Sequence, residues 1–109
     1  MKLSELIDAL KLNTLVDGDL DRDVTGCYIG DLLSWVMGRA QADCAWLTVM
    51  GNINAIAVAT LADVSCIVLV ENAPLDEDAK KKADMHEVTV LQTEETAYAL
   101  ALKLSELLK

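Results

Sequence analysis

Two short, almost wholly apolar segments stand between helical patterns in this chain, and they restrict its possible folds more than any other feature. The segments are "CAWLTVM" at 44–50 and "SCIVLV" at 65–70. Strands without polar alternation are usually covered on both faces, as in parallel sheets. A helical pattern follows each of them, at 54–62 and at about 76–85. This alternation predicts an α/β domain of three layers, in which helices cover both faces of a largely parallel or mixed central sheet.

The remaining patterns complete one domain that spans residues 1–109. Apolar residues at helical spacing predict a helix over 3–10, and further segments predict strands over 12–16, 24–29 and 88–91 and a helix over 31–39. Thr93 is expected to cap a C-terminal helix, with Glu94 and Glu95 in its first turn. A chain of 109 residues has room for one core of this kind.

The charge balance argues against two classes of partner. The formal net charge is -9, and the Lys and Arg residues form no stripe interleaved with aromatic residues. Nucleic acid and anionic membranes are therefore not expected as partners. The apolar runs are too interrupted to span a membrane, and the N-terminus lacks the pattern of a secretory signal. We expect a cytoplasmic protein.

No set of residues with catalytic or metal-binding spacing is found. Cys27, Cys44 and Cys66 lie far apart, each within an apolar run, which is typical of small buried side chains in a reducing compartment. His86 is the single histidine, so no zinc set is available, and no serine or cysteine has a histidine near it in sequence. We expect His86 at the surface. The sequence thus predicts a protein that is not an enzyme and has no metal or cofactor.

The segment "VTGCYIGDLLSWVM" at 24–37 combines a strand, a turn and a helix. Its glycines Gly26 and Gly30 are isolated, and no phosphate-binding motif is present. We expect Asp31 to act as the N-cap of the following helix, where its carboxylate would accept hydrogen bonds from free backbone N–H groups. The alternative, that Asp31 contacts a ligand, stays open.

A second polar turn, at 51–54, lies between a predicted strand and a predicted helix. Asn54 is expected to cap that helix, and Asn52 to bond the backbone of the turn. Ligands of open α/β sheets usually bind at the carboxyl ends of strands. An alternative is therefore a small-ligand site, formed where the following residues converge: Gly30, Asp31, Ser34, Thr48, Asn52 and Asn54.

The helix at 54–62 is apolar around its whole circumference. A helix of this kind has to be covered on every side, and in a small domain a second chain can provide part of the cover. We therefore predict a homodimer, with Ile56 and Ala59 as contacts. Trp35, on the short helix, is either a core residue or a further contact of this kind.

Two longer segments resemble the DRTGG domain family, and together they cover nearly the whole chain: "DRDVTGCYIGDLLSWVMGRAQADCAWLTV" and "NINAIAVATLADVSCIVLVENAPLDEDAKKKA". The matching elements include Val24-Thr25-Gly26 and Gly30-Asp31. The sequence departs from the family pattern at two positions. Cys27 stands where a second glycine is common, and Trp35 stands where a polar residue is common.

The resemblance implies a fold and a function. Domains of this family are similar to the N-terminal domain of HPr kinase/phosphorylase and occur within larger regulated enzymes, and some stand-alone copies are encoded beside iron hydrogenase genes. The resemblance therefore implies a non-catalytic regulatory or assembly module in a bacterial metabolic or redox system. Its implied partner is a metabolic or redox enzyme, for example a hydrogenase. The alternative function is a domain that senses a nucleotide or another metabolite.

Overall fold

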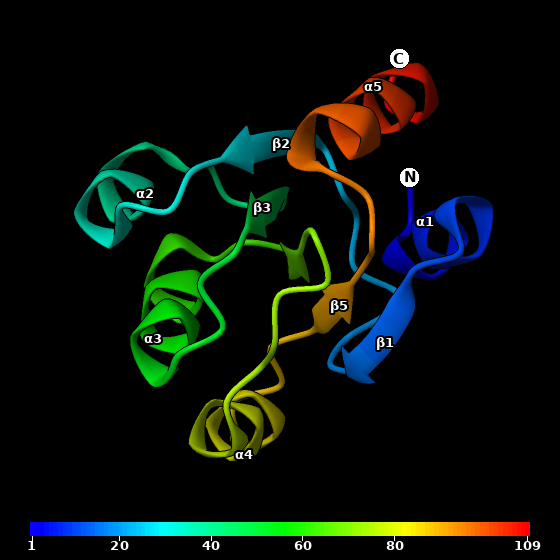
Figure 1. Cartoon of the computed structure of the whole chain (residues 1–109). Helices are drawn as coiled ribbons and strands as arrows, with labels where there is room; N and C mark the ends of the chain where they lie inside the picture. The colour runs from blue at the N-terminus through cyan, green and yellow to red at the C-terminus, as the bar shows by residue number, and fades with distance from the viewer.

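The computed structural model describes residues 1–109, which form five helices and five strands (Figure 1). Every element expected from the sequence is present, mostly with somewhat narrower bounds. In chain order the elements are α1 (Leu3–Leu10), β1 (Asn13–Val16), β2 (Gly26–Ile29), α2 (Leu33–Arg39), β3 (Cys44–Thr48), α3 (Ile53–Ala62), β4 (Cys66–Leu69), α4 (Glu77–Met85), β5 (Val90–Gln92) and α5 (Ala97–Leu107).

The five strands form one mixed sheet in the order β1-β5-β4-β3-β2. Strands β2 to β5 are parallel to one another, and β1 pairs antiparallel with β5. The chain therefore passes from β1 at one edge of the sheet to β2 at the other edge, and then returns strand by strand. This arrangement confirms the predicted α/β fold with a mixed sheet.

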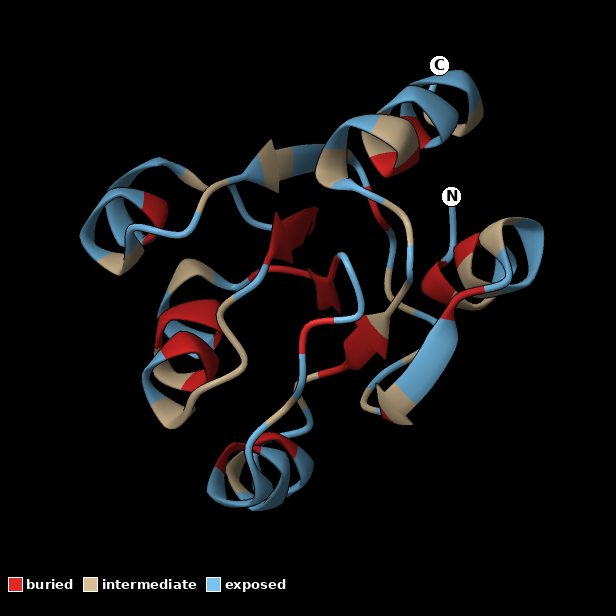
Figure 2. Cartoon of the chain, viewed as in Figure 1, coloured by how far each residue is buried: buried red, intermediate tan, exposed pale blue.

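Helices cover the two faces unequally (Figures 1 and 2). α2, α3 and α4 pack on one face, in a core that includes Trp46 and Ile67. α1 and α5 pack on the other face, in a core that includes Leu47 and Val68. Because the side chains of each strand alternate between the two cores, β3 and β4 are buried along their whole length. This explains why their sequences are apolar except for Thr48 at the end of β3.

The apolar helix α3 is covered largely by its own chain. It lies between α2 and α4, and Ile56 and Ala59 are only 1% and 2% exposed. These two side chains have no free surface to offer a second copy, so the dimer contact predicted through them has to be corrected. The reason is positional, since α3 is the middle helix of its layer and needs no cover from outside. Leu61 is its one large exposed apolar side chain.

Two further local predictions are wrong. The cap of α5 is Thr96, whose hydroxyl accepts a hydrogen bond from Ala99 N, while Thr93 accepts from Glu95 N in the preceding turn. Cys27 is exposed, because its strand β2 lies at the edge of the sheet. No helix has both the length and the apolar character needed to cross a membrane.

Candidate functional site

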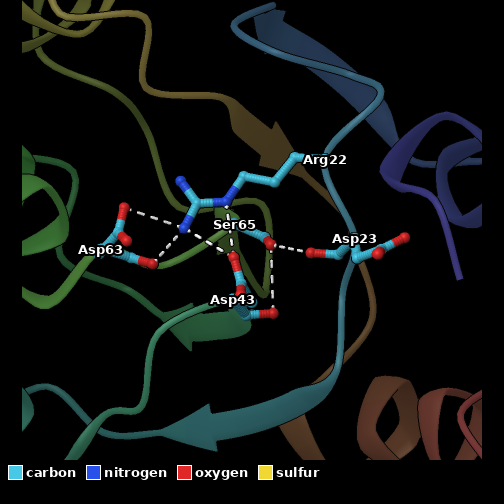
Figure 3. Close-up of polar contacts among 5 residues, drawn as sticks. All are labelled: Arg22, Asp23, Asp43, Asp63 and Ser65. Atoms are coloured by element: carbon cyan, nitrogen blue, oxygen red, sulfur yellow. Dashed lines mark hydrogen bonds and ion pairs between the residues drawn. The ribbon is translucent and has the colours of Figure 1, made fainter.

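One arginine connects three turns at the amino ends of the parallel strands (Figure 3). Arg22 lies in the segment that leads to β2. Its Nε donates to Asp43 Oδ1 at 3.0 Å, and its Nη2 lies 2.9 Å from Asp43 Oδ1 and 2.9 Å from Asp63 Oδ1. Burial lowers the pKa of Arg22, but the hydrogen bonds and charges of the two aspartates raise it by more. The guanidinium is therefore permanently charged and held in place.

The two aspartates that Arg22 contacts adopt an uncommon backbone conformation. Asp43 precedes β3 and Asp63 ends α3, and their φ angles of 67° and 58° lie in the left-handed region. Aspartate tolerates this region better than most residues. Ser65 reinforces the same place, because its hydroxyl bonds the backbone carbonyls of Asp23 and Asp43 (Figure 3). The cluster thus aligns the starts of β2, β3 and β4.

We did not identify Arg22 as important from the sequence. A signal was present, since Asp43 and Asp63 each stand just before a buried strand, and Arg22 is one of only two arginines in an acidic chain. The cluster contains no nucleophile with a base, and Arg22 Nε and Nη2 and the Ser65 hydroxyl bond the two aspartates or backbone carbonyls. Chemically, it is a structural clamp and not a reaction site.

Asp31 connects the opposite ends of two of these strands, β2 and β3. Its Oδ1 accepts a hydrogen bond from the Thr48 hydroxyl at 2.7 Å and another from Val49 N at 3.0 Å. The first residue before α2 is Leu32, and no side chain caps this helix. The predicted N-cap role of Asp31 is therefore wrong. Its carboxylate turns toward the end of β3, where the buried Thr48 hydroxyl requires a partner.

The other residues of the predicted ligand site make separate local contacts or are exposed. The carbonyl of Gly30 accepts from Trp46 Nε1 at 2.9 Å, and Asn52 caps α3 by accepting from Ala55 N at 2.9 Å. Asn52 therefore has the capping role that we expected of Asn54, which lies within the helix and is exposed. Ser34 is also exposed, in the first turn of α2. Five hollows of the surface are lined by other residues.

The thiols and the histidine show no catalytic arrangement. Burial raises the pKa of the Cys44 and Cys66 thiols, so both are protonated at neutral pH. His86 is exposed at the end of α4. No three or more His, Cys, Asp or Glu side chains are grouped closely enough to hold a metal ion.

Large apolar side chains are exposed around the end of β2 and along α2. Five of them lie on both sides of the sheet edge at β2 and are together called the β2–α2 surface: Ile29, Leu32, Trp35, Met37 and Val49. Ile29 is paired with Leu47 of the α1 and α5 core, so its side chain lies on the other side of the edge from α2. Trp35 is 53% exposed, and the guanidinium of Arg39 lies 3.8 Å from the centre of one of its rings. The surface borders the outer edge of β2, which pairs with no other strand. Half of the large apolar side chains that the chain leaves exposed belong to this surface, and the others, among them Leu61, Met85 and Tyr98, lie on other elements.

Comparison with known proteins gives one family and one related fold. A family model described as DRTGG domain matches residues 5–107. No curated protein matches the chain significantly. Among solved structures, the chain is similar to the CBS and DRTGG domains of the regulatory region of Clostridium perfringens pyrophosphatase, complexed with the activator diadenosine tetraphosphate, at a TM-score of 0.71 and 9% identity. The match covers 93% of this chain and 44% of that one, less than half of its length, and shows the shared fold.

Proposed function

Since this chain belongs to the DRTGG domain family, we propose that it is a non-catalytic regulatory module that acts by pairing with a second copy of itself through the β2–α2 surface. The observation that carries the proposal is the contrast between the polar and the apolar groups near β2. The Asp31 carboxylate and the Thr48 hydroxyl bond each other, while Ile29, 51% exposed, and Trp35 face outward.

The two edges of the sheet differ in a way that supports this choice. Proteins commonly protect exposed edges with bulges, prolines or charged side chains. The β1 edge has an irregular register between Thr14 and Val16 and begins with the exposed residues Asn13 and Thr14. The β2 edge is regular along its four residues and contains no charged side chain or proline. Both strands are short, so length does not distinguish them.

The distribution of charge favours a second copy as the partner. Two chains of net charge -9 repel each other over most of their surfaces. Within residues 24–42, however, only Asp31 and Arg39 are charged, and the Asp31 carboxylate is bonded to Thr48 and Val49. Two copies can therefore approach here with little repulsion. A two-fold axis beside β2 would pair the two β2 edges antiparallel and bring both Trp35 side chains toward the interface.

Sedimentation of the purified chain at micromolar concentrations tests the proposal. We expect the wild type to sediment as a dimer, and Ile29→Lys and Trp35→Lys each to weaken the dimer at least about tenfold, because each would bury a charge in an apolar contact. Both side chains are half exposed, so neither change should unfold the monomer.

Met85→Lys is the matched control, because Met85 is a large apolar side chain on α4 that is 76% exposed and outside the β2–α2 surface. It should leave the dimer unchanged. A wild-type chain that still sediments as a monomer at about 100 μM would contradict the proposal.

A second candidate function is small-ligand sensing, favoured by the likeness to a regulatory region crystallised with an activator. Thermal-shift measurements with adenine nucleotides and acyl phosphates test it. A ligand at a hundred times its dissociation constant stabilises the folded state by ~2.7 kcal/mol. For a domain of this length that raises Tm by roughly 10 °C or more. If none of these compounds shifts Tm, this candidate loses its support.

The enzyme that such a module would serve is proposed from the family resemblance alone. It is a metabolic or redox enzyme, with a hydrogenase as the specific candidate. Titration of a purified hydrogenase against the wild type and Trp35→Lys would show whether binding requires the dimer. If the wild type and Trp35→Lys bind the hydrogenase equally, the β2–α2 surface plays no part in that binding.

A further inference from the structure

The connections of the sheet change sides at one place, between β4 and β5. The chain leaves β2, β3 and β4 toward α2, α3 and α4, which lie on one face, but it leaves β5 toward α5 on the other face (Figure 1). The loops 70–76 and 93–96 therefore diverge from neighbouring parallel strands. In open α/β sheets, ligands bind in the crevice that such a divergence creates at the carboxyl ends of the strands.

The surface is hollowed at this point. A cavity of about 410 Å³ is lined by Asn72 from the first loop, by Thr93, Glu94 and Glu95 from the second, and by Lys11 and Lys103 from the helices α1 and α5 that border it. Its volume falls within the usual range of small-molecule sites. Topology and surface shape thus indicate the same location independently.

The two loops hold each other in a fixed position. Glu71 and Asn72 have consecutive left-handed φ angles of 55° and 57°. Glu71 N donates to Glu95 O at 2.8 Å, and Asn72 N donates to Thr93 O at 2.8 Å. The rim of the cavity is therefore built from bonded backbone, although most of its side chains are exposed.

The charges on the cavity wall are balanced but only partly paired. Lys103 forms an ion pair with Glu95, so these two groups neutralise each other. Lys11 and Glu94 also line the cavity and form no ion pair. The side-chain amide of Asn72 has no hydrogen-bond partner within the chain. The wall of the cavity thus includes one cation, one anion and one amide that the chain leaves without a side-chain partner.

We propose that this cavity binds a small zwitterion, of which α-amino acids are the simplest class. Lys11 receives the carboxylate, Glu94 receives the ammonium group, and the side-chain NH2 of Asn72 donates a hydrogen bond to a carboxylate oxygen. A zwitterion has no net charge, so the overall charge of -9 does not repel it as it would repel a phosphate or a dicarboxylate. The site lies toward the β1 side of the sheet, away from β2, and the inference does not depend on the proposed dimer.

The test is an NMR titration of the ¹⁵N-labelled chain with each of the twenty standard α-amino acids, up to about 10 mM. We expect at least one of them to move the side-chain amide resonances of Asn72, Gln92 and Asn13 and the backbone resonance of Thr93, all of which line the cavity. The best binder is then compared with analogues that lack its ammonium or its carboxylate. For alanine these are propionate and ethylamine, and both should bind more weakly.

Charge variants assign the two ends of the ligand. Lys11→Gln and Glu94→Gln should each raise the dissociation constant about fivefold, as expected for exposed charged contacts. Lys81→Gln on α4 is the matched control, because Lys81 is exposed and does not line the cavity. Trp35→Lys, which addresses the dimer, should bind the amino acid as the wild type does.

Three outcomes would overturn the inference. The first is that no amino acid moves the cavity resonances. The second is that propionate binds as tightly as alanine, which would indicate a simple anion site. The third is that Lys81→Gln weakens binding as much as Lys11→Gln does. Loss of binding in Trp35→Lys would instead tie this site to the dimer interface and contradict their independence.

Discussion

Arg22 shows how a single side chain can align several strands. Its guanidinium contacts two aspartates, Asp43 before β3 and Asp63 at the end of α3. No other cation pairs with either carboxylate. The planar fork of arginine allows several contacts at once, whereas a lysine ammonium acts as a point charge. At this scale, Arg22 has a structural role that its contacts with Asp43 and Asp63 explain.

Arg22→Lys should lower the free energy of unfolding by about 1–2 kcal/mol, because lysine keeps the charge but loses part of the hydrogen-bond set. Urea unfolding followed by circular dichroism measures the change. Arg39→Lys is the matched control, since Arg39 contacts the exposed Trp35 ring and forms no ion pair. An equal loss in both variants would mean that the contacts of Arg22 do not stabilise the fold.

Asp31 offers a second test at this scale. Asp31→Ala leaves the Thr48 hydroxyl, 2% exposed, without its acceptor and should cost about 1–3 kcal/mol. Asp31→Asn keeps an acceptor oxygen and should cost less. In a double-mutant cycle with Thr48→Val, we expect a coupling energy of about 1 kcal/mol. Additive effects in that cycle would show that the two side chains do not depend on each other.

At the scale of elements, helix α3 depends on one of two neighbouring asparagines. Asn52→Ala should lower the free energy of unfolding by about 1 kcal/mol, because Asn52 accepts the hydrogen bond from Ala55 N. Asn54→Ala should be neutral or slightly stabilising, since Asn54 is exposed within the helix and alanine favours helices. Thermal unfolding of the pair decides the matter. The reverse order of stabilities would contradict the assigned cap.

The elements themselves could largely be predicted from the sequence, because they depend on local patterns. The runs 44–48 and 66–69 are buried on both faces, and their lack of polar alternation reports this directly. The caps could not be predicted as well. Two residues suited to cap a helix can lie within three positions of each other, as Thr93 and Thr96 do. Which side chain caps the helix also depends on partners far away in sequence, because Asp31 bonds Thr48 and does not cap α2.

The order of the strands could not be predicted from the sequence either. The segment that contains β2 lies at an edge of the sheet, and Cys27 is exposed there although its apolar surroundings in sequence predict burial. Ile56 and Ala59 are apolar because α3 is central in its layer. Local pattern reports that a side chain is covered but not which segment covers it.

At the scale of the whole molecule, two glycines set how closely distant loops approach. A Cβ on Gly51 would lie 1.9 Å from the Pro74 carbonyl oxygen, and one on Gly18 would lie 2.1 Å from the Glu87 carbonyl oxygen. Both neighbours are backbone atoms and cannot rotate away. These contacts join the ends of the β3–α3 and β4–α4 connections and fix the segment that follows β1.

Gly51→Ala should therefore destabilise the protein by about 1–3 kcal/mol, since the loop has to shift to relieve the overlap. Gly38→Ala is the matched control, because nothing lies within 4 Å of its Cβ and the residue is inside α2. There alanine should add up to about 1 kcal/mol of stability. Calorimetry of both variants measures whether each substitution lowers or raises the stability. An unchanged stability of Gly51→Ala would contradict the close approach of the two loops.

The pairing of β1 with β5 also affects how the protein is made. Asn13 bonds Gln92 across the sheet, although 79 positions separate them. Because the ribosome synthesises the N-terminal part first, β1 emerges long before β5, the strand with which it pairs. The parallel strands can assemble one after another, but the sheet is completed only after synthesis has passed β5. The earliest strand to appear is thus the last to find its place, and a chain stalled before residue 90 would carry it as an open, unpaired segment.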